Sequence, residues 1–203
     1  MPFFSSVSSP TATHRAIMIF IDGGYLRKIM QEVVSSDSID FDKLRDLLIK
    51  YTGPGHMYVS YGTIAGELIR IFYYDAIVEH KDDSVKNEEQ QKYFDLIKTS
   101  RFYEVRLGRL IKTGKEYKQK GVDVLLAADM ITKAYQNQYD ICILLAGDDD
   151  LIDVVQAVKN AGKRVFGVYK KDSASKRLIE SFDSRYELNP DLIKSLVLKP
   201  PSN

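Results

Sequence analysis

The sequence has few of the residues that disulfides and zinc sites require. Its 203 residues include one cysteine and three histidines. A single cysteine excludes an intrachain disulfide, and one cysteine with three histidines makes no structural zinc site. Cys142 lies in the apolar run ICILLAG, so we expect a buried, unreactive thiol.

An excess of charge and a long apolar run are also missing. Lys and Arg number 29 against 28 Asp and Glu, for a formal net charge of +1. Nucleic-acid binding would therefore depend on local clusters of charge. No apolar stretch approaches the roughly 20 residues that span a bilayer, and the N-terminus lacks the pattern of a secretory signal. We expect a cytoplasmic protein without a membrane segment.

What the sequence does contain is an alternation of short apolar runs with longer amphipathic stretches. It predicts an α/β domain over residues 15–190, between a flexible leader (1–14) and a C-terminal tail (191–203). Near-continuous apolar strands predict a mostly parallel sheet covered on both faces. The predicted strands are 16–21, 68–78, 102–111, 141–147 and 164–169, and the predicted helices are 25–34, 41–53, 87–100, 122–136, 148–160 and 175–182.

Aspartates follow two of the strongest predicted strands. Asp22 follows AIMIFI, and the run Asp148-Asp149-Asp150 follows ICILLAG. Because parallel strands end at one edge of a sheet, we expect Asp22 and Asp148 to lie close together there. Asp123 belongs to the first turn of the predicted helix 122–136, which brings a further carboxylate from a third element.

These aspartates have a simpler interpretation as helix caps, since Asp is common in the first turn of a helix. A cap needs only one carboxylate, however, and several together repel one another unless a cation neutralises them. Oxygen ligands without nearby His or Cys favour Mg²⁺ or Mn²⁺. Asp149 lies between two candidate ligands, and we expect its side chain to point elsewhere.

At these residues the sequence resembles the NYN domain family, the LabA-like (DUF88) branch of the PIN-like nucleases. The resemblance covers about residues 15–185 and is carried by FIDGGYL (20–26), KGVDVLLAADM (120–130) and LLAGDDDL (144–151). It implies a three-layer α/β/α fold with five parallel strands in the order 3-2-1-4-5. The sequence differs where many relatives carry Asn, Ser and Phe, and has Tyr25, Ala146 and Leu151 there.

The resemblance also implies metal-dependent cleavage of RNA. Carried over position by position, the catalytic and metal-binding residues are Asp22, Asp123, Asp148 and Asp150, with Mg²⁺ or Mn²⁺ as the cofactor. Ions held by Asp22, Asp148 and Asp150 would activate a water and stabilise charge on the phosphate, and Asp123 would complete the metal shell or orient the water. The number of ions is left open.

A basic segment precedes Asp123 and is the best candidate for RNA contact. It contains Lys112, Lys115, Tyr117, Lys118 and Lys120. Lysines with one aromatic residue could hold a phosphate backbone and stack a base, which favours single-stranded RNA as the partner. A solvated hairpin or loop is the equally plain alternative. Arg106 and Arg109 could extend the patch. A second basic group around strand 164–169 is assigned to solubility.

Three further aspects stay open from the sequence. Asp75 could face the same edge of the sheet, and Asp129 is a candidate for a supporting position behind the metal ligands. Segment 53–66 is compatible with a lid, a substrate wall or a dimer contact, so a homodimer is left open.

The sequence also bears on three functions other than that of a nuclease. A non-catalytic RNA-binding or regulatory module on the same fold is the main alternative. A haloacid-dehalogenase-type phosphohydrolase needs a second Asp two residues after the first, where this sequence has Gly24. A receiver domain needs an acidic pair near the first strand, and FIDGG supplies one acid. There is also no P-loop motif and no Ser-His-Asp or Cys-His constellation.

Overall fold

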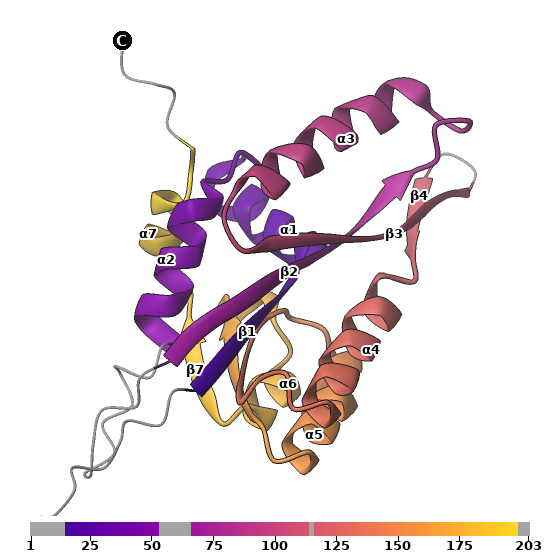
Figure 1. Cartoon of the computed structure of the whole chain (residues 1–203). Helices are drawn as coiled ribbons and strands as arrows, with labels where there is room; N and C mark the ends of the chain where they lie inside the picture. The colour runs from indigo at the N-terminus through magenta and orange to yellow at the C-terminus, as the bar shows by residue number, and fades with distance from the viewer. Residues whose placement is uncertain (1–14, 53–65, 114–115, 199–203) are drawn as a thin grey trace, which may run out of the picture.

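The structure, a computed structural model, describes residues 15–52, 66–113 and 116–198 (Figure 1). The predicted leader and most of segment 53–66 lie outside these ranges. The described residues form one sheet of seven strands in the order β4-β3-β2-β1-β5-β6-β7. The strands are β1 (Arg15–Asp22), β2 (Gly66–Val78), β3 (Tyr103–Thr113), β4 (Glu116–Lys120), β5 (Ile141–Leu145), β6 (Arg164–Tyr169) and β7 (Ser184–Glu187).

Helices connect these strands. They are α1 (Gly23–Val34), α2 (Phe41–Thr52), α3 (Ser84–Thr99), α4 (Val122–Tyr135), α5 (Ile152–Asn160), α6 (Lys176–Ser181) and α7 (Pro190–Ser195), with short 3₁₀ turns η2 (Asp149–Leu151) and η3 (Lys171–Ser173). The mixed α/β fold is confirmed. The predicted order 3-2-1-4-5 corresponds to β3-β2-β1-β5-β6, which pair in parallel at the centre of the sheet.

The predicted number of five strands is wrong, because a strand is added at each edge. β4 pairs antiparallel with β3, and β7 pairs parallel with β6. Their sequences, EYKQK and SRYE, have no apolar run. Their extended form comes from pairing with a neighbour, which a pattern of local hydrophobicity does not register. Charged edge strands of this kind also discourage pairing with other chains.

Two separate apolar cores lie on the two faces of the sheet. In β1, Ile17, Ile19 and Ile21 face one core, while Met18 and Phe20 face the other. Helices α1, α2, α3 and α7 supply the first core, and α4, α5 and α6 supply the second. Because both faces of the central strands are buried, these strands are apolar at nearly every position rather than at alternate ones.

The C-terminal part of the described chain belongs to the first core. α7 begins at Pro190, where the sequence predicted the domain to end, and Ile193 and Leu196 are fully buried. No helix of the described residues is both long and apolar enough to cross a bilayer.

The starts of α1 and η2 meet at the carboxyl edge of the parallel strands. β1 and β5 are neighbours with Ile21 opposite Leu145, so the residues that follow them lie side by side. Asp22 caps α1, since its Oδ1 accepts from the Tyr25 amide at 3.0 Å. Asp148 caps η2 in the same way, through the Asp150 amide at 3.2 Å. The segment predicted as one helix from Asp148 therefore begins as a 3₁₀ turn and continues as α5.

Gly147 lets the loop after β5 approach α1 closely. A Cβ at Gly147 would lie 2.3 Å from the Tyr25 ring and 2.9 Å from the Ser173 carbonyl oxygen. Real Cβ atoms do not come so near, so only glycine allows the β5 loop, α1 and the loop after β6 to meet at this point.

Candidate active site

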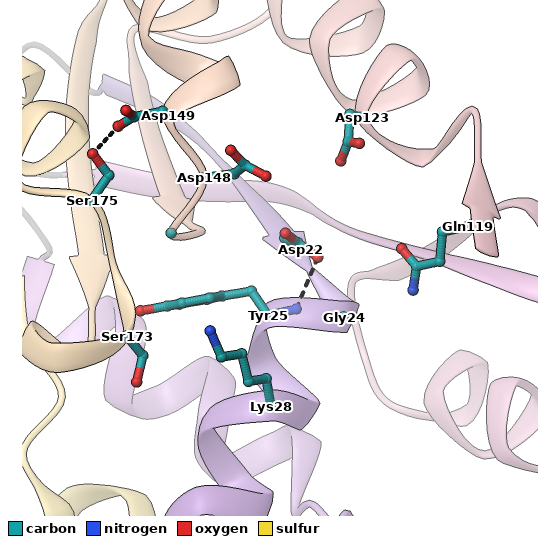
Figure 2. Close-up of a pocket in the computed structure, with 11 residues that line it drawn as sticks. Asp22, Gly24, Tyr25, Lys28, Gln119, Asp123, Asp148, Asp149, Ser173 and Ser175 are labelled. Atoms are coloured by element: carbon teal, nitrogen blue, oxygen red, sulfur yellow. Dashed lines mark hydrogen bonds between the residues drawn. The ribbon is translucent and has the colours of Figure 1, made fainter. Parts of the chain in front are cut away.

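A cavity of about 630 Å³ opens at this carboxyl edge (Figure 2). It is lined by residues from β1, α1, β4, α4 and the loops after β5 and β6, which are distant in the sequence. These residues are Asp22, Gly24, Tyr25, Lys28, Gln119, Asp123, Gly147, Asp148, Asp149, Ser173 and Ser175.

Three of the four predicted metal-binding aspartates line this cavity. Asp22 ends β1, Asp123 lies in the first turn of α4, and Asp148 follows β5. Figure 2 shows the three carboxylates around a common space. Asp22 accepts hydrogen bonds from the Tyr25 and Gly24 amides, and Asp148 accepts one from the Asp150 amide. The N-cap of α4 is Gly121, so Asp123 is not occupied as that cap.

Burial and neighbouring carboxylates raise the pKa of two of these acids. Burial raises the pKa of Asp22, and the nearby carboxylate of Asp123 raises it further, although the Tyr25 amide opposes the shift. Burial also raises the pKa of Asp123, with added contributions from Asp148 and Asp150. Carboxylates that raise one another's pKa hold a proton or a cation more readily than isolated ones.

Asp150 and Asp149 differ in their surroundings. Asp150 is exposed and does not line the cavity, although its charge acts on Asp123. Asp149 lines the cavity, but its carboxylate is bound to other side chains. It accepts a hydrogen bond from the Ser175 hydroxyl and pairs with Arg177 at 3.4 Å. Figure 2 shows Asp149 turned toward Ser175.

A divalent cation would fit this site because carboxylate oxygens are suitable ligands, and not because a complete coordination shell is already formed. Among the described residues, no three His, Cys, Asp or Glu side chains are grouped closely enough to hold one ion. Mg²⁺ does not need such a cage, because it keeps several waters and binds through one or two carboxylates and the phosphates of a substrate. The carboxylates of Asp22, Asp123 and Asp148, with raised pKa values at Asp22 and Asp123, fit an ion of this kind.

Most other polar groups of the cavity wall are bound to one another. The Tyr25 hydroxyl accepts from the Lys170 amide at 2.9 Å and donates to the Lys170 carbonyl at 3.4 Å. Ser173 donates to Glu32 and accepts from the Lys170 ammonium at 3.0 Å. The hydrogen bonds that Glu32 accepts from Ser173 and from the Lys170 ammonium lower the pKa of Glu32. Together they fasten the loop after β6 to α1 and fix one wall of the cavity.

Sequence reasoning missed Lys28 and Gln119, whose side chains line the cavity. Helical spacing could have indicated Lys28, because residues four apart lie on one helix face and Gly24 belongs to the predicted motif. Gln119 gave no such signal. It reaches the site because β4 pairs with β3, and its amide lies 3.2 Å from where a Cβ of Gly24 would be.

The predicted RNA-binding segment is a β-hairpin. Lys115 lies outside the described residues. Lys112 is paired with Tyr117 across the hairpin, and residues directly opposite share a face. Alternation along β4 puts Tyr117 and Gln119 on one face and Lys118 and Lys120 on the other. The predicted group is therefore divided between two faces of the hairpin.

Tyr117 is engaged with the start of α3. Its hydroxyl donates to Asp83 at 3.1 Å, and the Lys86 ammonium lies 3.7 Å above its ring. A base could stack on this ring only by displacing Lys86. Lys112, Lys118 and Lys120 are exposed.

The two additional aspartates considered from the sequence lie outside the cavity lining. Asp75 is fully buried and bound to Arg27, with further hydrogen bonds from the Tyr73 hydroxyl at 3.2 Å and the Ala76 amide at 2.7 Å. Asp129 accepts from the Tyr74 hydroxyl at 2.9 Å and lies 3.4 Å from the Lys133 ammonium. Both stabilise the scaffold.

The expectation for Cys142 is confirmed. This residue is fully buried, and burial raises the pKa of its thiol.

Helices on both faces of a mostly parallel sheet, with an acidic cavity at its carboxyl edge, define a mixed α/β fold with a candidate metal site at that edge. The chain belongs to the NYN domain family, whose sequence profile matches residues 16–189. NYN domains have a PIN-like nuclease fold, typically bind RNA, and nucleases of this kind usually use divalent metals.

A crystal structure of a protein of unknown function, VPA0982 from Vibrio parahaemolyticus RIMD 2210633, is similar to this chain. The TM-score is 0.62 at 20% sequence identity, over 87% of this chain and 94% of that one. At this identity the likeness concerns the fold alone. Among curated proteins, none matches the sequence.

Proposed function

We propose that this protein is a metal-dependent ribonuclease that hydrolyses phosphodiester bonds of RNA at the cavity between β1, α4 and β5. The observation that supports it most strongly is the convergence of Asp22, Asp123 and Asp148 from three separate elements on one cavity. Helix capping involves Asp22 and Asp148 but does not account for Asp123, because the N-cap of α4 is Gly121. Family membership supports the same class of activity.

In this proposal Asp22, Asp123 and Asp148 hold Mg²⁺ or Mn²⁺ beside the RNA phosphate, and Asp150 contributes through its charge. A divalent ion bound there would supply positive charge to the phosphate oxygens and acidify a water. Asp123 would complete the metal shell or orient the attacking water. The single-stranded form of the RNA, a cytoplasmic location and a homodimer stay predictions from the sequence.

The test is cleavage of an end-labelled single-stranded RNA by the purified chain with Mn²⁺ or Mg²⁺. Excess EDTA should stop cleavage. Asp148→Asn should slow it by about two orders of magnitude or more, because the site would lose several kcal/mol of charge stabilisation. Asp153→Asn is the matched control, since Asp153 is an exposed aspartate of α5 outside the cavity lining.

The outcome that contradicts the proposal is equal cleavage by the wild type and Asp148→Asn, which would indicate a contaminating nuclease. A chain that binds RNA but does not cut it would support the alternative, a non-catalytic RNA-binding module.

A further inference from the structure

The polar side chains of the cavity divide into those that already have protein partners and those that do not. The Tyr25 hydroxyl is bound to Lys170 in the loop after β6, and the Ser173 hydroxyl is bound to Glu32. Ser175 and Asp149 are bound to each other. Apart from Asp22 and Asp148, which cap helices, and Asp123, the remaining polar side chains are Lys28 and Gln119. No hydrogen bond or ion pair of either is found within the described parts of the chain.

Lys28 is the cationic side chain of the cavity lining. It is exposed and extends from α1 toward the cavity (Figure 2). Lys170, in the loop after β6, is held by Glu32 at 3.2 Å and by Ser173. The charge of Lys28 contributes to the lowered pKa of Glu32, four residues further along α1. Phosphate oxygens are the natural ligands of an ammonium group that extends toward a cavity in this way.

Gln119 stands on the opposite wall, on β4 (Figure 2). Its amide offers two N–H donors and one carbonyl acceptor, which suits the hydroxyl of a ribose or the edge of a base rather than a phosphate alone. Gly24 lies between the two walls, and a side chain there would crowd Gln119. A nucleotide can therefore reach the Gln119 amide past the start of α1.

We propose that Lys28 and Gln119 are the substrate-binding residues of this cavity, with Lys28 holding a backbone phosphate next to the scissile one and Gln119 hydrogen-bonding the sugar or base of a nucleotide on the opposite side. This inference rests on the proposed function for the identity of the ligand as RNA. It places the RNA across the cavity from α1 to β4. The main contacts are then inside the cavity rather than on the lysines of the outer hairpin face.

The experiment measures binding without cleavage. A fluorescent single-stranded RNA is titrated with the full chain in EDTA at several salt concentrations, followed by anisotropy. Loss of one phosphate contact should reduce the slope of log K against log salt by about 0.7. Lys28→Gln should weaken binding and show this smaller slope, while Lys28→Arg should keep the slope. Gln119→Ala should weaken binding at an unchanged slope, because the amide carries no charge.

The controls are Lys92→Gln on α3 and Gln156→Ala on α5, both exposed and outside the cavity lining. Neither should change affinity or slope by more than the error of the measurement. Circular dichroism of each variant verifies that the fold is retained, which is expected since Lys28 and Gln119 have exposed side chains.

The outcomes separate this inference from the nuclease proposal. If the wild type binds RNA through Lys28 and Gln119 but cleaves nothing, the binding site stands and the nuclease proposal fails. If the wild type cleaves RNA while Lys28→Gln and Gln119→Ala bind and cleave like their controls, the nuclease proposal stands and this inference is wrong. Absence of RNA binding by the wild type also overturns it. When cleavage is present, both variants should raise KM more than they lower kcat.

Discussion

At the scale of single residues, the charge of Asp123 is unfavourable in the folded protein without a cation. The dipole of α4 favours a carboxylate in its first turn, but burial and the charges of Asp148 and Asp150 outweigh this effect and raise the pKa. An acid whose pKa is higher in the folded state destabilises the fold as the pH rises above its unfolded value of 3.8. The aspartate that the proposed function requires at this position is therefore less favourable for stability than a neutral residue would be.

Asp123→Asn should accordingly stabilise the metal-free protein at pH 7, by about 0.5 kcal/mol, the scale of a partly exposed charge interaction. The gain should disappear well below pH 3.8, where the carboxyl is protonated in both the folded and the unfolded state. Urea unfolding in EDTA at the two pH values measures this difference. A variant less stable than the wild type at pH 7, or a gain that persists in acid, would contradict the electrostatic account of the site.

The contribution of Gly147 is steric, whereas that of Asp123 is electrostatic. Gly147→Ala should destabilise the protein by about 1–3 kcal/mol, because the added Cβ meets the Tyr25 ring at 2.3 Å and the Ser173 carbonyl at 2.9 Å. Denaturant unfolding measures the change. In a Tyr25→Leu background the same substitution should be less damaging, and an equal effect in both backgrounds would show that the ring is not the obstacle.

At the scale of elements, a buried ion pair fastens α1 to β2 beneath the site. Asp75 has no exposed surface, and Arg27 binds both of its oxygens. Removing one member of a buried pair leaves an uncompensated charge. Arg27→Met should therefore destabilise the protein by about 3 kcal/mol at neutral pH, as measured by thermal or denaturant unfolding.

Arg45→Met on α2 is the comparison, because Arg45 pairs with Asp42 and Asp46, whose side chains are 58% and 67% exposed. Its effect should stay below about 1 kcal/mol. Equal losses in the two variants would mean that burial of Asp75 does not decide the outcome.

The elements also show what the sequence could predict. β1 and β5 were predictable because both faces of each are buried, which leaves an apolar run that ends in aspartate. β4 was not, since EYKQK forms a strand only through its pairing with β3. Asp22 and Asp148 could be assigned to one edge because both follow parallel strands, and Asp123 could be added from the resemblance to the family motif. Gln119 could not, because its place in the cavity depends on the pairing of β4 with β3.

At the scale of the whole molecule, metal binding and folding should be coupled. A ligand that binds only the folded state stabilises it by about 2.7 kcal/mol at 100 times its Kd. For a chain of this size that corresponds to a rise in Tm of about 5–10 °C. Mn²⁺ should raise the Tm of the wild type and of Asp153→Asn in differential scanning calorimetry. The rise should be lost in Asp148→Asn, and a rise in all three would point to binding elsewhere.

Asp22, Asp123 and Asp148 are the proposed ligands of a divalent cation. Anomalous diffraction from crystals of the protein grown with Mn²⁺ is the sharpest test, since it locates manganese without assumptions about the ligands. We expect a peak within the cavity, coordinated by at least two of these carboxylates and by waters. A peak bound only elsewhere, or an empty cavity at a saturating concentration of Mn²⁺, would contradict the proposal.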